Sequence, residues 1–268
     1  MTDTLSVAPQ GHYRIKHAAR SEIVKILTLR STFITLGLTV VASLLVTGLV
    51  TNSALHHQPM WYNGFDPTSQ SLIGMITVAL AGGVFGALLI TGEYSSGTIR
   101  STLAATPRRP VLLAAKIGVT AVATAVFCEV LSFATFFLGQ AILSGGGAPT
   151  ATLGSPGALR AVMMTGLFIA LLTLMAFGFG LIFRSTAAAI AAFVGVVFVL
   201  PLVMHGISQY DVRYLPTQIL TQSIMTTVSQ GPGGASPPLT PAVGLSLMAV
   251  YAAIAVVVGA ALFVRRDA

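Results

Sequence analysis

The sequence is poor in charged side chains. Only 8% of its 268 residues are Asp, Glu, Lys or Arg, whereas a typical globular domain carries roughly 25%. A water-facing surface cannot be built from so few charges, but a lipid-facing surface can. Because 54% of the residues are hydrophobic, the composition excludes a soluble protein and predicts an integral membrane protein. The chain is also too short to hold both a set of spans and a separate soluble catalytic domain.

Several kinds of functional site are missing as well. Cys128 is the single cysteine, so the chain forms no internal disulfide and no cysteine-based metal site. No G-x-x-x-x-G-K-[ST] motif occurs, so the chain cannot cradle ATP phosphates in the usual way. A metal site at His56, His57 and Asp66 is not expected, because adjacent histidines do not face one site on a helix. We predict no catalytic residues and no metal, and therefore not an enzyme.

Six apolar stretches are long enough to cross a bilayer, which takes about 20 residues per helix. The fourth and fifth are separated only by a tight turn at Arg184. The fold class is therefore an all-α integral membrane protein with six transmembrane helices in a single domain, 1–268. The expected spans are 32–51, 71–92, 111–143, 161–183, 186–204 and 242–264.

The net charge of +7 comes from basic residues that are unevenly distributed between the two sides of these spans. We do not expect nucleic acid as a partner, since the cations are scattered between apolar runs. Only Arg160 and Arg213 fall on one side. The positive-inside rule places the other side, with both termini, in the cytoplasm, where anionic membrane lipids are expected partners. That side holds Arg14, Lys16, Arg20, Lys25, Arg30, Arg100, Arg108, Arg109, Lys116, Arg184, Arg265 and Arg266.

Two segments outside the spans have an amphipathic pattern. Residues 12–30 predict an interfacial helix, because Ile15, Ala19, Ile23, Ile26 and Leu27 fall on one broad face. The alternative is a disordered basic tail that only satisfies the charge rule. The outer loop, 205–241, contains a moderately apolar stretch too short to span, which predicts a re-entrant or amphipathic segment between the fifth and sixth helices.

The connection 93–110 after the second span mixes an acid, small residues and bases. A carboxylate at the membrane border costs less than one at the bilayer centre, and Gly97 permits a turn or the close approach of a partner. We expect a short cytoplasmic helix along the membrane plane. The alternative is an ordinary hairpin loop that satisfies the charge rule. The candidate residues are Glu93, Gly97, Thr98, Ile99, Arg100 and Leu103.

This connection resembles the coupling segment of bacterial type-2 ABC transporter permeases. The resemblance rests on Glu93-Tyr94-x-x-Gly97-Thr98-Ile99-Arg100-x-x-Leu103-x-x-x-Pro107-x-Arg109, followed by Lys116. The turn Phe183-Arg184-Ser185-Thr186 and the Tyr214-Leu215-Pro216 element are similar to the same family. The likeness extends over residues 12–266.

The resemblance implies the permease subunit of an ATP-driven efflux system in a bacterial cell membrane. Two protomers, expected as a homodimer, would form the translocation pathway. Each would dock a cytoplasmic ATP-binding subunit through the coupling segment. ATP and Mg would be bound by that partner, and this chain would hold no cofactor. The family likeness does not select a substrate.

Glu129 is an ionisable residue near the middle of the third span. Intramembrane carboxylates are rare and usually face protein or a water-filled cavity, so Glu129 is a candidate for the translocation path. A packing role is the alternative. The competing functions are an ion-coupled secondary carrier without an ATPase partner, a membrane-embedded enzyme, and a sensory or assembly subunit. Glu129 is nearly the only intramembrane titratable group, which argues against the carrier.

Overall fold

The computed structural model describes residues 15–28, 30–56, 65–99, 109–207, 212–226 and 239–265. Within these ranges all regular secondary structure is helical, and six helices are long and apolar enough to cross a membrane. The prediction of an all-α membrane protein is confirmed. The six helices are Arg30–Leu55, Pro67–Ser95, Pro110–Gly145, Ala158–Phe183, Thr186–Met204 and Pro241–Arg265.

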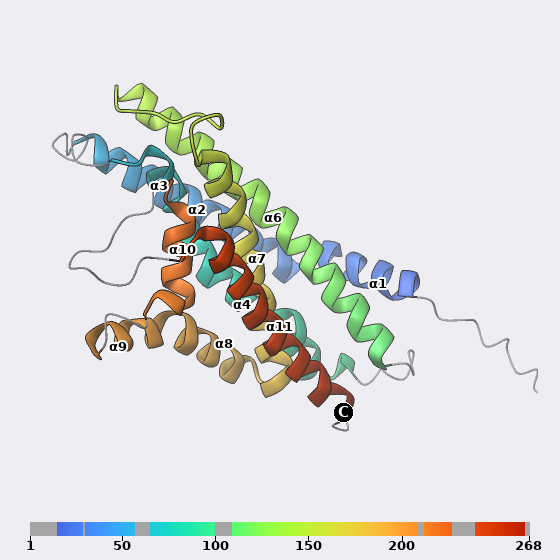
Figure 1. Ribbon diagram of the computed structural model, residues 1–268. Coiled ribbons are helices and arrows are strands. Elements are labelled where there is room, and N and C mark those ends of the chain that lie inside the picture. Colours follow the sequence, from blue (N-terminus) through green and yellow to red (C-terminus); the bar gives the residue numbers. More distant parts are fainter. Residues whose placement is uncertain are drawn as a thin grey trace, which may run out of the picture.

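Shorter helical elements flank or subdivide these six (Figure 1). The full order is α1 (Ile15–Thr28), α2 (Arg30–Leu55), α3 (Pro67–Leu72), α4 (Met75–Ser95), α6 (Arg109–Gly145), α7 (Ala158–Phe183), α8 (Thr186–Val194), the π-helical η2 (Gly195–Val199), α9 (Leu200–Ile207), the 3-10 helix η3 (Val212–Tyr214), α10 (Pro216–Ile224) and α11 (Pro241–Arg265).

Helix α7 is the centre of the bundle and packs against α4, α6 and α11. Small residues allow these close contacts, as they do in other membrane helices. A Cβ at Gly86 would lie on the backbone oxygen of Thr173, and one at Gly178 would lie 2.6 Å from the carbonyl carbon of Ala255. The large side chains of Phe168 and Phe177 on α7 are fully buried. The core of the protein therefore lies around α7.

Helix α2 turns a polar stripe inward and an apolar face outward. Thr39, Ser43, Thr47 and Thr51 are buried at a spacing of four residues. Thr39 Oγ1 donates to the backbone oxygen of Thr35, which satisfies the hydroxyl within the helix. The opposite face exposes its large apolar side chains, as a lipid-facing surface does. These are Phe33, Ile34, Leu38, Val41, Leu45 and Leu49.

The fifth span is irregular for an identifiable reason. Pro201 follows the π-helical turn η2 and has no backbone N–H to donate to it. Within that turn, the carbonyl oxygen of Val197 accepts a hydrogen bond of 3.0 Å from Thr217 Oγ1 on α10. In a bilayer such a carbonyl has no water available. A side chain of the neighbouring helix thus supplies a hydrogen bond to a carbonyl of the turn that precedes Pro201.

One end of the bundle is closed by polar contacts among α3, α7 and α10. Asp66 caps α3 by accepting from the backbone N–H groups of Thr68 and Ser69. Its second oxygen accepts from the backbone N–H of Thr226 at 2.7 Å and from Thr226 Oγ1 at 2.8 Å. Arg160 donates to the carbonyl oxygens of Met225 and Thr226. Asp66 is thus engaged by α3 and by the residues that follow α10.

The described residues of the predicted outer segment, 205–241, include the amphipathic helix α10. It packs on α7 and α11, and its apolar residues Ile219, Leu220 and Ile224 are buried. A Cβ at Gly244 of α11 would lie 2.5 Å from a methyl group of Ile219, so α10 lies tightly against that span.

Candidate functional site

Three elements far apart in the sequence meet at the other end of the bundle. Helix α1 lies along α6 (Figure 1). The last turns of α4 and the first turns of α6 face it there. Each contributes charge: Glu22 and Lys25 come from α1, Glu93 from α4, and Lys116 from α6. Glu22 and Lys25 share one face of α1 because residues three apart are neighbours on a helix.

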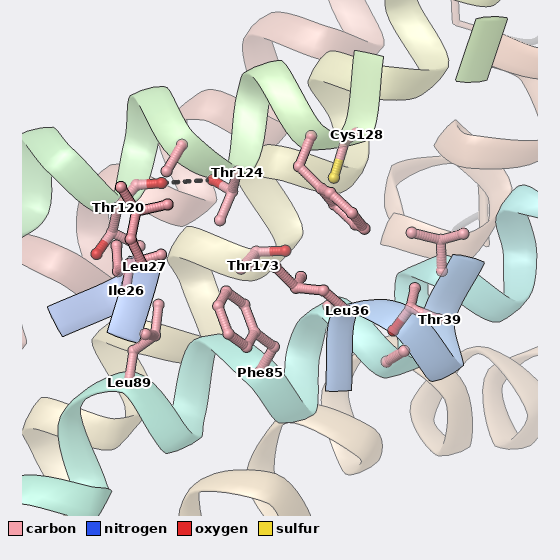
Figure 2. Close-up of a pocket in the computed structure, with 15 residues that line it drawn as sticks. Ile26, Leu27, Leu36, Thr39, Phe85, Leu89, Thr120, Thr124, Cys128 and Thr173 are labelled. Carbon is pink, nitrogen blue, oxygen red and sulfur yellow. Dashed lines mark hydrogen bonds between the residues drawn. The ribbon is translucent and has the colours of Figure 1, made fainter. Parts of the chain in front are cut away.

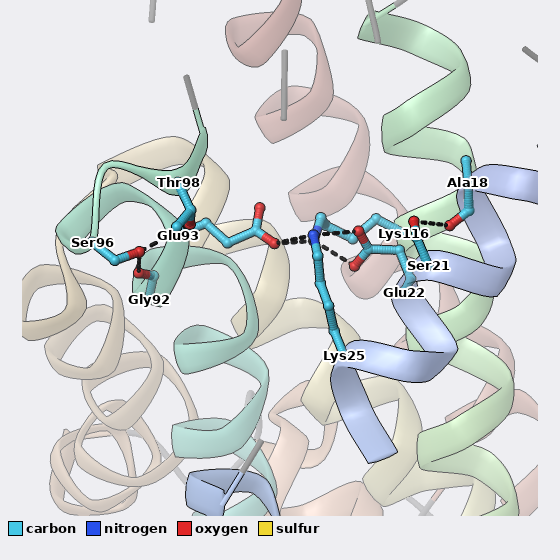
Figure 3. A network of polar contacts seen from close by, with 9 residues as sticks. All are labelled: Ala18, Ser21, Glu22, Lys25, Gly92, Glu93, Ser96, Thr98 and Lys116. Atoms are coloured by element: carbon cyan, nitrogen blue, oxygen red, sulfur yellow. Dashed lines mark hydrogen bonds and ion pairs between the residues drawn. The ribbon is translucent and has the colours of Figure 1, made fainter. Parts of the chain in front are cut away.

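These four side chains form a closed ring of ion pairs, shown in Figure 3. Lys116 Nζ lies 2.6 Å from Glu22 Oε2 and 2.7 Å from Glu93 Oε1. Lys25 Nζ lies 2.9 Å from Glu22 Oε1 and 3.0 Å from Glu93 Oε1. Two carboxylates and two ammonium groups alternate around the ring, so it is electrically neutral. We refer to Glu22, Lys25, Glu93 and Lys116 as the charge ring.

The charge ring is buried unevenly. The side chains of Lys116 and Glu22 are 5% and 6% exposed, that of Glu93 is 13% exposed, and that of Lys25 is 38% exposed. Removing charges from water is costly, and mutual attraction offsets that cost only with good geometry and additional hydrogen bonds. Each carboxylate here meets two ammonium groups, which supplies that geometry.

The ring shifts the pKa values of its α1 members. Burial alone would raise the pKa of Glu22, but the attraction and hydrogen bonds from Lys116 and Lys25 outweigh it and lower that pKa below 4.5. Burial alone would lower the pKa of Lys25, but its contacts with Glu22 and Glu93 raise it above 10.5. Both shifts favour the charged forms. Glu22 and Lys25 are therefore charged around neutral pH.

The structure describes part of the segment that the sequence singled out for coupling. Helix α4 ends at Ser95, and Gly97 has a φ of +71°, the left-handed conformation that favours glycine. Among the described residues, no atom lies within 4 Å of a Cβ at Gly97, and the glycine makes a turn there. Thr98 is exposed, while Ile99 is 4% exposed and packs with Phe177 and Phe263.

The buried Ile99 side chain thus attaches the segment after Gly97 to the core. Residues 95–98 are exposed and form the tip of this connection. Helical residues begin again at Thr98 and Ile99. Arg100 and Leu103 lie outside the described residues, as does most of the expected coupling helix.

The turn between α7 and α8 also reaches this end of the bundle. Arg184 has a φ of 54°, which ends α7 and lets α8 begin two residues later. Its guanidinium lies 5.4 Å from the centre of the Tyr94 ring, a cation–π distance. Thr186 Oγ1 donates to Thr91 Oγ1 on α4 at 2.9 Å. The fourth and fifth spans are therefore attached to the segment that contains Glu93.

Sequence reasoning missed the role of α1 in this site. The sequence-based prediction of α1 rested on its apolar face and gave its charged residues no role in a site. In the structure the buried residues are Ala18 and Glu22, while Ile23, Val24 and Leu27 are 46–61% exposed. One signal was available: Glu22 is one of only seven acidic residues in the chain and stands alone in a basic segment. An isolated acid there indicates a specific partner.

Glu129 lies away from the charge ring, on the part of α6 that faces α7. A Cβ at Gly166 would lie 2.7 Å from its carboxyl carbon, so glycine is what makes room for this side chain. Both carboxylate oxygens are buried and accept no hydrogen bond from the described residues. Glu129 is therefore a separate site.

No group of three or more His, Cys, Asp or Glu side chains among the described residues is arranged to hold a metal ion. Asp66 makes the hydrogen bonds given above, and His57 lies outside the described residues.

Comparison with known protein families finds a match over most of the chain. The family described as "Protein of unknown function (DUF2705)" matches residues 53–268, so the chain belongs to this family. No curated protein matches the chain. The matched region begins after α1 and most of α2, and it contains Glu93 and Lys116 but not Glu22 or Lys25.

Proposed function

We propose that this DUF2705 protein is the membrane-spanning permease subunit of an ATP-driven ABC exporter. Two protomers form the translocation pathway in a bacterial cell membrane. Separate ATP-binding subunits attach at the end of the bundle that carries the charge ring. The chain itself performs no catalysis, and ATP and Mg are bound by the partner.

The charge ring is the observation that most supports this proposal. It joins the interfacial helix α1, the end of span α4 and the start of span α6 into one unit. The exposed tip at residues 95–98 projects directly from that unit. A push on the tip would therefore move α1, α4 and α6 together. Arg184 on Tyr94 would extend the movement to α7 and α8.

The distribution of basic residues supports the cytoplasmic placement of this end. This end of the bundle carries the two lysines of the charge ring, Lys25 and Lys116, and also Arg184. Arg160 lies at the opposite end, which is closed by the contacts of Asp66. Cytoplasmic loops carry the excess of Lys and Arg. Cysteine labelling tests the assignment: Ser95→Cys should react with an impermeant maleimide only after the cells are permeabilised, and Thr150→Cys should react in intact cells. The reverse pattern would overturn the orientation.

The test of the transport role is purification of the tagged protein from its native membrane in mild detergent, with mass spectrometry of bound proteins. A stoichiometric ABC ATPase subunit is expected. Arg100→Glu should reduce its recovery by about tenfold or more, equivalent to ~1.4 kcal/mol of binding free energy. Arg213→Glu, at a position assigned to the opposite side, is the control and should leave recovery unchanged.

Two results would contradict the proposal. One is a wild-type protein that carries no ATPase subunit under these gentle conditions. The other is normal ATPase binding and transport after residues 94–103 have been replaced.

Glu129 favours an alternative, an ion-coupled secondary carrier that needs no ATPase. A buried carboxylate without a hydrogen bond among the described residues is a candidate for proton or cation binding. This alternative expects ion-gradient-driven transport by the purified protein in vesicles, and loss of that transport in Glu129→Gln. ATP-dependent transport that Glu129→Gln leaves unchanged would exclude it.

A further inference from the structure

A cavity of about 210 Å³ lies between α1, α2, α4, α6 and α7. Figure 2 shows Phe85 and Leu89 of α4 on one side of it and Thr124 and Cys128 of α6 on the other. Thr173 of α7 lies between them. The cavity is larger than the roughly 150 Å³ apolar cavity that stays dry and binds benzene in another protein. It can therefore hold a short length of hydrocarbon.

The lining of this cavity offers few polar groups for orienting a polar ligand. Three of its four threonine hydroxyls already donate to their own helix. Thr39 Oγ1 bonds the oxygen of Thr35 at 2.7 Å, Thr124 Oγ1 that of Thr120 at 2.7 Å, and Thr173 Oγ1 that of Ile169 at 3.0 Å. The rest of the lining is almost entirely apolar. Water would gain few hydrogen bonds there, so the preferred occupant is a hydrocarbon.

The position of α1 indicates where such an occupant would enter. Helix α1 packs mainly on α6 and only slightly on α2, which leaves the cavity bordered by the α1–α2 corner. Leu27 lines the cavity and is also 61% exposed, so it stands at the mouth. Arg30, exposed at the start of α2, follows it by three residues. A cation beside an apolar opening matches an anionic headgroup above an acyl chain.

We propose that this cavity is a binding site for one acyl chain of a membrane phospholipid, drawn from the leaflet that α1 borders. The chain enters at the α1–α2 corner past Leu27 and ends among Phe85, Thr124 and Phe127. The phosphate lies at the level of Arg30. The lipid fills the space under α1 and supports the packing of α1 against α6. This site does not depend on the proposed transport role.

Photo-crosslinking in vesicles tests the site on the full chain. The protein is reconstituted in phosphatidylcholine and phosphatidylglycerol, with a fraction of the phosphatidylglycerol carrying a diazirine at the end of one acyl chain. The side chains of Phe85 and Thr124 are only 8% and 4% exposed, so lipid around the protein does not reach them. Crosslinks at these two residues are expected. Crosslinks confined to outward-facing residues such as Leu45 would overturn the proposal.

A matched pair of variants strengthens the test. Ala123→Phe fills the cavity, which Ala123 lines, and should abolish crosslinking at Phe85 and Thr124. Ala114→Phe lies at an exposed position of α6 outside the cavity, so it should leave crosslinking at Phe85 and Thr124 unchanged. Equal crosslinking in both variants would contradict the proposal. If Ala123→Phe fails to fold, the wild-type pattern still decides. A free fatty acid that carries the same diazirine is tested in parallel. If the fatty acid labels Phe85 and Thr124 and the phospholipid does not, the cavity is not a phospholipid site.

Discussion

Lys116 and Glu22 form a buried ion pair of 2.6 Å across 94 residues of sequence. Lys116 belongs to the third span, and Glu22 belongs to a helix that precedes the first. Neither side chain is more than 6% exposed. The pair therefore fixes the position of α1 against the bundle, and Glu93 joins the two residues to the end of α4.

Loss of Lys116 should destabilise the protein strongly. Lys116→Met leaves the carboxylates of Glu22 and Glu93 facing each other with only Lys25 to neutralise them. Removing one partner of a buried pair typically costs about 3–5 kcal/mol. Lys25→Met should cost only about 0–1 kcal/mol, because Lys25 is 38% exposed and solvent screens its interactions. The free energy of unfolding in an SDS titration measures both. Equal costs would show that burial does not determine the strength of these contacts.

The contribution of Glu22 should depend on pH in a defined direction. Its folded pKa is lowered below 4.5, so its stabilising effect is fully present above pH 4.5 and is lost as the pH falls through the folded value. Glu22→Gln should therefore unfold at a lower temperature than the wild type at pH 7. The difference between the two should shrink as the pH falls below 4.5, because the unfolded chain then binds a proton at Glu22 more readily than the folded protein does. A difference that stays constant down to pH 3 would contradict this assignment.

The same linkage has the opposite sign for Lys25. Its folded pKa is raised above 10.5, so its contribution is complete below pH 10.5 and is lost as the pH rises through the folded value. Between pH 4.5 and pH 10.5, Glu22 and Lys25 should therefore contribute a constant amount to stability. Thermal unfolding of the wild type and Lys25→Met between pH 6 and pH 9 should show a difference that does not change with pH.

Gly166 should be required for the packing of Glu129. A Cβ at position 166 would lie 2.7 Å from the carboxyl carbon of Glu129, and overpacking of this kind typically costs about 1–3 kcal/mol. Gly166→Ala should therefore destabilise the protein, and Glu129→Ala in the same chain should remove most of that cost. Gly118→Ala is the control, since no atom of the described part of the chain lies within 4 Å of a Cβ there. It should be neutral or stabilising by up to about 1 kcal/mol. A double variant no more stable than Gly166→Ala would show that other groups crowd the position.

The hydrogen bond between Thr217 and Val197 should compensate for Pro201. Thr217→Val keeps the shape of the side chain but leaves the Val197 carbonyl without its donor, which should cost about 1–3 kcal/mol. Pro201→Ala restores a backbone N–H to the preceding turn, so it should reduce the cost of Thr217→Val. A double-variant cycle on the free energy of unfolding measures this coupling. Purely additive effects would show that the two positions act independently.

Much of the fold follows from local sequence. The six spans could be predicted because a helix that crosses a bilayer satisfies its own backbone, so its length and apolar character are enough to reveal it. The turn at Gly97 and the break at Arg184 were equally local, since each depends on the residues beside it. The sequence also singled out Glu93 by its expected position at the membrane border, and a coupling role for this residue stays a prediction. These features needed no knowledge of which helices are neighbours.

What the sequence left undecided depends on contacts between distant elements. Hydrophobic periodicity predicted an apolar face on α1, but the helix turns Glu22 inward because Lys116 of α6 lies there as its ion-pair partner. The donor for the Val197 carbonyl and the cavity under α1 also arise only when separate helices pack together. Charge pairing and packing are set by distance in space. The sequence by itself therefore determined the spans and their breaks, and only the tertiary structure decided which polar groups meet.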